Sequence, residues 1–256
     1  MVDYIPRYAA APLQLFVDSW KSNVRLLHLS MRGLRVLTRM PGVFENLLEH
    51  SDPDEQARLT SDLSEARKEA ELAEQESKTG FPLLHANALV AMWWAVESAI
   101  EDMLVGILLN EAEILKKEVF ARICVPLVDL ETKDREERMR LLLSELGRNL
   151  GRKRGVNAFE CLLKCFDLSG PVKDDDRKLI WQMHYLRDVI VHRNGCADRR
   201  LVEACPWLQL EVNEPVIISH AIFTQFAHAL CGYVVTVIHR LEVRYDVDTH
   251  PQRYSR

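Results

Sequence analysis

The chain has 256 residues, with 33 lysines and arginines against 38 aspartates and glutamates, and a formal net charge of −5. A hydrophobic content of 48% excludes wholesale disorder, and the acidic balance excludes a globally basic nucleic-acid coat protein. Ten glycines and ten prolines are few turn-forming residues for this length, which favours long helices over an all-β fold.

Residues 1–80 predict an N-terminal helical extension. Apolar residues at spacings of three and four between Leu13 and Arg39 indicate an amphipathic helix that ends at Pro41-Gly42. The segment 45–76 is acidic, with eleven carboxylates against three basic residues. Its narrow seam of mostly small residues consists of Leu59, Leu63, Ala66, Ala70 and Ala73. We expect this helix to pack closely on a neighbour and to show its charged sides to water.

Residues 81–256 predict a second helical domain, which follows the break at Gly80-Phe81-Pro82. The segment Leu83–Lys117 is the most apolar long helix, and Glu97 and Glu101 interrupt its apolar face. Because buried carboxylates need a partner, we expect both to face a cationic group or an interface. The segment 133–154 is basic, with eight cations against four carboxylates, and the loop 148–155 is either a solvated connector or a phosphate contact.

The rest of the chain predicts three further helices and one small β-hairpin. We expect the helices at 156–166, 173–193 and 219–244. Asn213-Glu214-Pro215 separates two short apolar runs, 208–212 and 216–219, and predicts a hairpin turn. The expected fold class is therefore an all-α helical bundle with one small β-hairpin before the C-terminal helix.

The sequence predicts a cytoplasmic protein without cofactors. Residues 1–12 lack an apolar run behind a basic start, and no stretch reaches the roughly 18 uncharged apolar residues of a membrane helix. The segment 221–238 comes nearest and is better explained as a buried helix. The six cysteines include no CxxC pair, so we expect small buried apolar residues rather than zinc ligands.

The helix expected at 173–193 has two contrasting faces. One face carries Leu179, Gln182, Met183, Leu186, Val189 and Ile190. The other carries Trp181, His184, Tyr185, Arg187, Asp188, Val191 and His192. A solvent-exposed face is ordinarily rich in lysine and glutamate and poor in aromatics, so the second face predicts a binding surface.

Three interpretations of this polar face compete. It is a subunit interface, where Tyr, Trp and Arg are enriched. It is a metal site made of His184, Asp188 and His192, which is disfavoured because three ligands along one helix span about 12 Å. In the third interpretation, Arg187 and His192 act together on a phosphodiester.

A motif on this helix favours the third interpretation. Arg187-Asp188-Val-Ile-Val-His192, followed by Arg193-Asn194-Gly195, resembles the Arg-x4–6-His motif of the HEPN superfamily. In that family the arginine is typically followed by a polar residue, and the motif lies late in a helical bundle. The resemblance covers about residues 81–245, with Leu83–Lys117 as the partner helix.

The resemblance implies a metal-independent endoribonuclease of a toxin–antitoxin pair or of phage defence. It implies a homodimer whose site lies in the dimer cleft, with Arg187, Asp188 and His192 as catalytic residues. RNA supplies its own nucleophile, the 2′-hydroxyl, and a histidine can exchange the proton at neutral pH. The arginine fork stabilises charge on the phosphoryl oxygens, and the products are a 2′,3′-cyclic phosphate and a 5′-hydroxyl.

Four neighbouring residues are candidates for binding RNA. Around the helix, His184 lies between Arg187 and His192 and would be a second proton carrier or contact phosphate, while Tyr185 would stack a base or pack in the core or at a dimer interface. Arg193 and Asn194 would contact phosphate, or Asn194 would cap the helix. Because positions 187 and 192 lie about 140° apart around the helix, a two-fold copy would bring both sets into one cleft.

Two alternatives remain. The chain is a catalytically silent HEPN-type binding or scaffold module, in which the polar face serves binding and not cleavage. Alternatively, it is an antitoxin-like interaction partner, because the acidic helix of segment 45–76 could mimic nucleic acid or shield a basic region.

Overall fold

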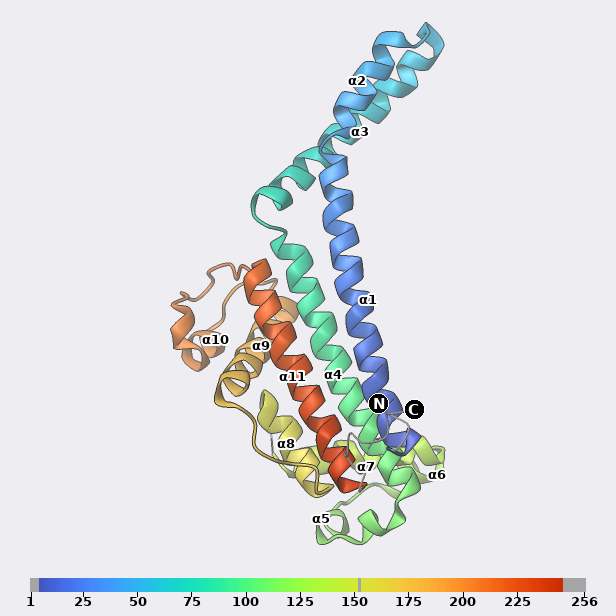
Figure 1. Ribbon diagram of the computed structural model, residues 1–256, viewed down its shortest axis with the longest axis vertical. Coiled ribbons are helices and arrows are strands. Elements are labelled where there is room, and N and C mark those ends of the chain that lie inside the picture. Colours follow the sequence, from blue (N-terminus) through green and yellow to red (C-terminus); the bar gives the residue numbers. More distant parts are fainter. Residues whose placement is uncertain (1–4, 152, 246–256) are drawn as a thin grey trace, which may run out of the picture.

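The computed structural model describes residues 5–151 and 153–245, which form helices joined by turns and loops (Figure 1). The expected all-α fold is confirmed. The elements are α1 (Arg7–Leu37), α2 (Met40–His50), α3 (Pro53–Lys78), α4 (Pro82–Asn110), η1 (Ala112–Lys116), α5 (Glu118–Ala121), α6 (Leu127–Glu131), α7 (Arg135–Asn149), α8 (Val156–Cys165), α9 (Asp174–His192), α10 (Arg199–Ala204), η2 (Pro206–Leu208) and α11 (His220–Arg244).

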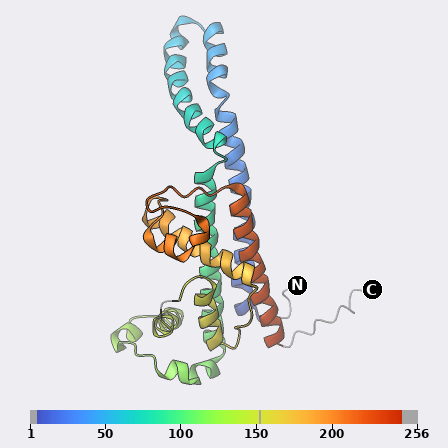
Figure 2. The same cartoon turned by 90° about the vertical axis from the view of Figure 1, so that its left-hand side faces the viewer.

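Three long helices, α1, α4 and α11, run side by side and form the frame of the molecule (Figures 1 and 2). At the closest approach of α1 and α4, a Cβ atom on Gly106 would lie only 2.3 Å from the carbonyl oxygen of Tyr8. A residue without a side chain is therefore needed at position 106. The helix α9 packs against both α4 and α11, which brings its polar residues next to α4.

Aromatic side chains hold α4, α8 and α11 together in the core. Trp93 of α4 is 1% exposed and packs against Phe159 of α8 in a tilted arrangement, with 5.6 Å between the ring centroids. Phe159 in turn stacks on Tyr233 of α11 at 5.9 Å. The Tyr233 hydroxyl donates to Glu160 at 2.8 Å, and Glu160 pairs with Arg240 at 2.7 Å. The hydroxyl of Tyr233, the carboxylate of Glu160 and the guanidinium of Arg240 thus partner one another, as burial requires.

The helices α2 and α3 form a projecting pair, here called the arm (residues 40–80), beyond the rest of the molecule, here called the body (Figures 1 and 2). No residue of α2 is buried, and α3 buries only Leu63, Ala66 and Ala73. These three belong to the predicted seam, which packs against α1 and α2, so the expected close packing is confirmed.

The structure corrects two predictions about this region. Pro41 does not end the first helix: α1 ends at Leu37, and Pro41 lies in the first turn of α2. Proline is tolerated there because the first N–H groups of a helix have no partner within it. The acidic segment is two helices rather than one, because the Asp52 side chain accepts hydrogen bonds from Asp54 and Glu55 and starts α3 afresh.

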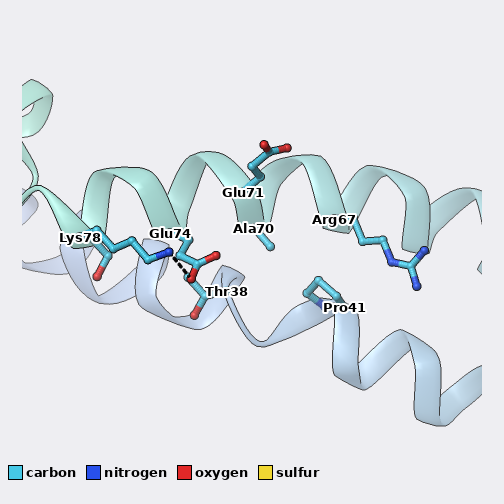
Figure 3. Close-up of a pocket in the computed structure, with 8 residues that line it drawn as sticks. Thr38, Pro41, Arg67, Ala70, Glu71, Glu74 and Lys78 are labelled. Carbon is cyan, nitrogen blue, oxygen red and sulfur yellow. Dashed lines mark ion pairs between the residues drawn. The ribbon is translucent and has the colours of Figure 1, made fainter.

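An open groove of about 760 Å³ lies between α3 and the turn that joins α1 to α2 (Figure 3). Lys78 pairs there with Glu74 at 2.8 Å. Arg67 pairs with Glu45 of α2 at 2.9 Å. The cations of this groove are therefore neutralised within the arm, and the groove brings no reactive set of side chains together.

The break between α3 and α4 is confirmed, and it is sharp. Gly80 and Phe81 both have left-handed backbones, with φ values of 81° and 60°. The buried His85 holds the turn from inside α4, with its Nδ1 at 2.8 Å from the Phe81 oxygen. Because Nδ1 donates to that oxygen, Nε2 accepts from the Nδ1 of His220 at 3.1 Å.

The predicted β-hairpin is wrong. In the described chain the region 195–216 shows one isolated antiparallel bridge, between Cys196 and Pro215, and no strand. The segment after Asn213 pairs mainly with the loop that follows α9: Ala197 donates to Glu214, and Val216 donates to Gly195, each at 2.8 Å, while a single turn bond of 3.1 Å joins Glu214 to Glu211. The apolar run 208–212 starts in η2 and continues as irregular chain, so it offers no partner strand.

The C-terminal helix α11 is long and apolar enough to cross a membrane by length and composition alone. Within its most apolar window, 44% of the residues are buried inside the molecule. Phe226, Leu230 and Val237 are among the residues that it buries. The prediction of a buried helix in this segment is therefore confirmed.

Candidate functional site

The helix α9 forms where the sequence places helix signals. Asp174, Asp175 and Asp176 fill its first turn, where carboxylates interact favourably with the helix dipole. Its end is set by Asn194 and Gly195, which have left-handed φ values of 53° and 75°. The Gly195 N–H donates to the carbonyl of Val189 at 3.0 Å. Asn194 and Gly195 therefore terminate the helix, in line with the capping alternative for Asn194.

Much of the predicted polar face of α9 contacts the chain itself. Tyr185 is only 7% exposed, and its hydroxyl accepts a hydrogen bond of 2.8 Å from Arg154. The indole N–H of Trp181 donates to the carbonyl of Ala204 at 3.2 Å. Tyr185 is therefore a packed side chain, and its ring is not free to stack a base in this conformation.

The basic segment 153–155, just before α8, lies across this face. A Cβ atom on Gly155 would lie 3.0 Å from the Cα of Trp181, and its φ is +56°. Arg154 places its guanidinium 5.0 Å from the centroid of the Tyr185 ring. Gly155 thus allows the chain to approach α9 closely, and the cation–π contact of Arg154 with Tyr185 holds it there.

Arg187 lies between two carboxylates. Its Nη1 lies 3.0 Å from Oδ1 of Asp188, and its Nη2 lies 3.8 Å from Oε2 of Glu97 on α4. The Arg187 side chain is 19% exposed, and its buried Nε has no hydrogen-bond partner among the residues described. The guanidinium is therefore fixed in orientation and retains one unsatisfied donor.

His184 is packed next to Arg187. Its ring makes edge contacts with Trp93 and Tyr185, with centroid distances of 5.4 and 5.5 Å. Its Nε2 lies 3.8 Å from Asp188, and its buried Nδ1 has no partner in the described chain. Burial lowers the pKa of His184, and Arg154 and Arg187 act in the same direction against the attraction of Asp188. The neutral imidazole is thus the favoured form.

Glu97 and Glu101 meet cations, as predicted from their positions on an apolar helix. Glu97 faces Arg187, and Glu101 lies 3.8 Å from Arg140 of α7. Burial raises the pKa of Glu97, although the Trp93 indole and Arg187 favour its charged form. The raised pKa means that this half-buried carboxylate is only partly compensated by Arg187.

His192 stands apart from this cluster. It is exposed at the end of α9, together with Val191, Arg193 and Asn194. Five positions separate it from Arg187, a rise of about 7.5 Å along the helix. Within one chain the structure therefore brings together Arg187, Asp188, His184 and Tyr185, and it leaves His192, Arg193 and Asn194 at the exposed helix end.

Several partners of the cluster could not be seen from the sequence motif. Trp93 and Glu97 come from α4, and Arg154 comes from a loop 33 positions before Arg187. Exposed apolar residues flank the cluster: Trp94 is 66% exposed and Val191 is 48% exposed. The tryptophan pair at 93–94 was visible, but only the structure separates its buried member from its exposed one.

The described residues contain no group of three or more His, Cys, Asp or Glu side chains placed to hold a metal ion. The six cysteines are free thiols, and burial raises the pKa of Cys205 and of Cys231 to about 11. Comparison of the chain with protein-family models, with curated proteins and with solved structures gives no match.

Proposed function

We propose that the protein is a metal-independent endoribonuclease that cleaves RNA to 2′,3′-cyclic phosphate ends, in a toxin–antitoxin or phage-defence setting. The observation that carries the proposal is the arginine on α9. Arg187 is oriented by Asp188 at 3.0 Å, keeps a buried unsatisfied Nε, and lies on the helix that exposes His192 at its end. The sequence resemblance to the HEPN superfamily assigns the same pair of residues.

The proposed chemistry needs only groups of RNA and of this chain. The 2′-oxygen attacks the adjacent phosphorus while its proton passes to a base, and the bond from phosphorus to the 5′-oxygen breaks. The leaving 5′-oxygen takes a proton, so no water enters this step. Because His192 is exposed, it is free to reach the substrate, whereas the packed His184 would help to position Arg187. Arg187 would stabilise the charge on the phosphoryl oxygens.

The proposal includes a homodimer, because one chain leaves the two motif residues at different places on α9. A two-fold pairing of the face around Val191 would bring His192 of one chain towards Arg187 of the other. Trp94 and Val191 supply exposed apolar surface for such contact. The same pairing would place the basic residue Arg193 at the edge of the cleft, where it could contact a phosphate of the RNA.

The test is cleavage of total RNA in excess EDTA, with analysis of the fragment ends. His192→Ala and Arg187→Ala are expected to abolish cleavage, while the wild type leaves 2′,3′-cyclic phosphates. The matched controls are His228→Ala, an exposed histidine of α11, and Arg25→Ala, an exposed arginine of α1. Cleavage that survives in both site variants, or that requires a divalent ion, would contradict the assignment.

A second candidate function is favoured by the charge around Arg187. Glu97 and Asp188 both lie next to the Arg187 guanidinium, and their negative charge would repel a phosphate. A catalytically silent module would use this surface to bind a protein, with Trp94 as the apolar anchor. In that case purified protein cleaves no RNA, and Trp94→Ala abolishes partner binding while His192→Ala preserves it. The antitoxin-like alternative would place the contact on the acidic helix α3 instead.

A further inference from the structure

A second, basic pocket lies on the body at the start of α9. It is distinct from the arginine cluster, the name used here for His184, Tyr185, Arg187 and Asp188. It has a volume of about 540 Å³ and lies between α8, the loop that leads to α9, and the first turn of α9. This volume falls within the range of small-molecule sites, about 300 to 1,000 Å³. Its lining includes three cations, Lys153, Lys164 and Arg177, which come from three different segments.

These cations are available to a ligand. Lys153 and Lys164 are exposed, and neither forms an ion pair with any carboxylate in the described part of the chain. Arg177 donates through Nη1 to the side chain of Asn157 at 2.7 Å. This bond orients the guanidinium and uses one of its five donors, so the rest of the fork remains for an anion.

The one carboxylate in the pocket lining is already neutralised. Glu160 accepts hydrogen bonds from the backbone N–H of Gly170 at 2.9 Å and from Tyr233 at 2.8 Å, and it pairs with Arg240 at 2.7 Å. Gly170 allows this arrangement, because a Cβ atom there would lie 3.1 Å from the Arg240 guanidinium. The nearby Asp167 pairs with Lys117 at 2.5 Å. The three lining cations therefore dominate the local charge.

Other charged groups near the pocket belong to the start of α9. Asp174, Asp175 and Asp176 precede Arg177, and none forms an ion pair with a pocket cation among the residues described. They lie in the first helical turn, where the helix dipole and the unpaired N–H groups compensate carboxylate charge. These three carboxylates are not among the residues that line the pocket, so an anion inside it meets the two lysines and Arg177.

We propose that this pocket binds a phosphate group. Arg177 supplies a planar fork that matches phosphate oxygens, and Lys153 and Lys164 supply mobile ammonium groups around it. Phosphate esters of a free nucleotide and of an RNA strand share this chemistry. The site does not depend on the ribonuclease proposal.

The position of the pocket on α9 relates it to the arginine cluster. Arg177, Trp181, His184 and Asp188 follow one another at spacings of four, three and four, so they share one side of the helix. Ten positions from Arg177 to Arg187 correspond to about 15 Å. An RNA strand that runs along α9 would therefore place one phosphate in the pocket and a different phosphate at the arginine cluster.

The experiment measures binding of two probes to the full chain at low salt. The probes are adenosine 5′-monophosphate and a short single-stranded oligonucleotide whose 2′-O-methyl groups prevent cleavage. The double variant Lys153→Gln/Lys164→Gln is expected to weaken binding of a probe about tenfold or more. It is also expected to reduce the slope of log affinity against log salt for the oligonucleotide by about one per lysine. Lys68→Gln, an exposed lysine of α3, is the matched control.

The outcomes separate the two sources of phosphate. Loss of monophosphate binding in the double variant identifies a nucleotide site, and loss of oligonucleotide binding alone identifies a strand site. Wild-type protein that binds neither probe, or a double variant that binds both as the Lys68→Gln control does, overturns the proposal. Because cleavage is not measured, the ribonuclease proposal stands or falls separately. Arg177→Lys keeps the positive charge but removes the planar guanidinium. It is expected to weaken binding of the probes while leaving the protein folded.

Discussion

The arm and the body are built from helices of similar length but are stabilised differently. In the body, α4 buries many large apolar side chains, and its Trp93 packs against Phe159 of α8. In the arm, α2 buries none, and α3 relies on a capping aspartate and on ion pairs such as Arg67–Glu45. Exposed ion pairs contribute little, about 0 to 1 kcal/mol each. Helical periodicity alone therefore does not indicate how strongly a helix is held.

The largest effect that separates the two regions is expected from deleting a core side chain. Trp93→Ala removes contacts with Phe159 and His184 and should lower the free energy of unfolding by about 3 to 5 kcal/mol. Leu72→Ala in the arm, where the side chain is 60% exposed, should change it by about 0.5 kcal/mol or less. Denaturant unfolding measures the free energy of unfolding of both variants. Equal losses would show that arm and body side chains contribute equally to stability.

Two helical glycines should respond to alanine with opposite signs. Gly106→Ala places a Cβ 2.3 Å from the Tyr8 carbonyl and forces α1 away from α4, which we expect to cost about 1 to 3 kcal/mol. Gly33 of α1 has no atom within 4 Å of a built Cβ, so Gly33→Ala should stabilise by about 0.5 to 1 kcal/mol. Thermal melting of the two variants tests the pair. Stabilisation by Gly106→Ala would mean that the close approach of α1 and α4 is absent in solution.

The arm should also open independently of the body. Asp52→Ala removes the bonds that its side chain accepts at the start of α3, at an expected cost of about 1 kcal/mol. Since α3 has few buried contacts, this loss should appear as faster amide hydrogen exchange in residues 53–78 while the body is unchanged. Asp134→Ala, which removes the capping box of α7, is the control in the body. Faster exchange throughout the chain after Asp52→Ala would show that arm and body unfold together.

The same contrast explains how far the sequence predicts the fold. Repeating apolar spacings identify α1, α4, α9 and α11, because each buries a face wide enough to leave a periodic signal. The break at Ser51-Asp52 was missed, because a capping aspartate within an acidic run gives no change of composition. The hairpin was predicted from a turn sequence between two short apolar runs, but the backbone after the turn pairs with the loop that follows α9, a contact that the local pattern does not encode.

For the candidate site, the sequence predicts residues but not their surroundings. The polar face of α9 and the need of Glu97 for a cation both follow from spacing. That Trp93 and Arg154 would cover His184 and Tyr185 does not follow, because it depends on how α4 and the segment 153–155 pack across α9. For the aromatic residues of this face the sequence left base stacking and packing as alternatives, and in the folded chain Tyr185 and Trp181 pack against other segments.

The smallest effect concerns acid sensitivity, which we expect to reside in the body. Burial lowers the pKa of both His85 and His184 below the ordinary value of 6.5. Each is neutral in the folded protein and must be charged in the unfolded chain at lower pH, so its stabilising contribution is present above pH 6.5 and lost as the pH falls below it.

His184→Gln removes one of these groups. The difference in unfolding free energy between wild type and this variant, measured by denaturant unfolding, should therefore shrink from pH 7.5 to pH 5.5. A difference that grows on acidification would mean that Asp188 outweighs burial and that His184 is charged in the folded state, which would make it a proton donor rather than a packed positioning residue.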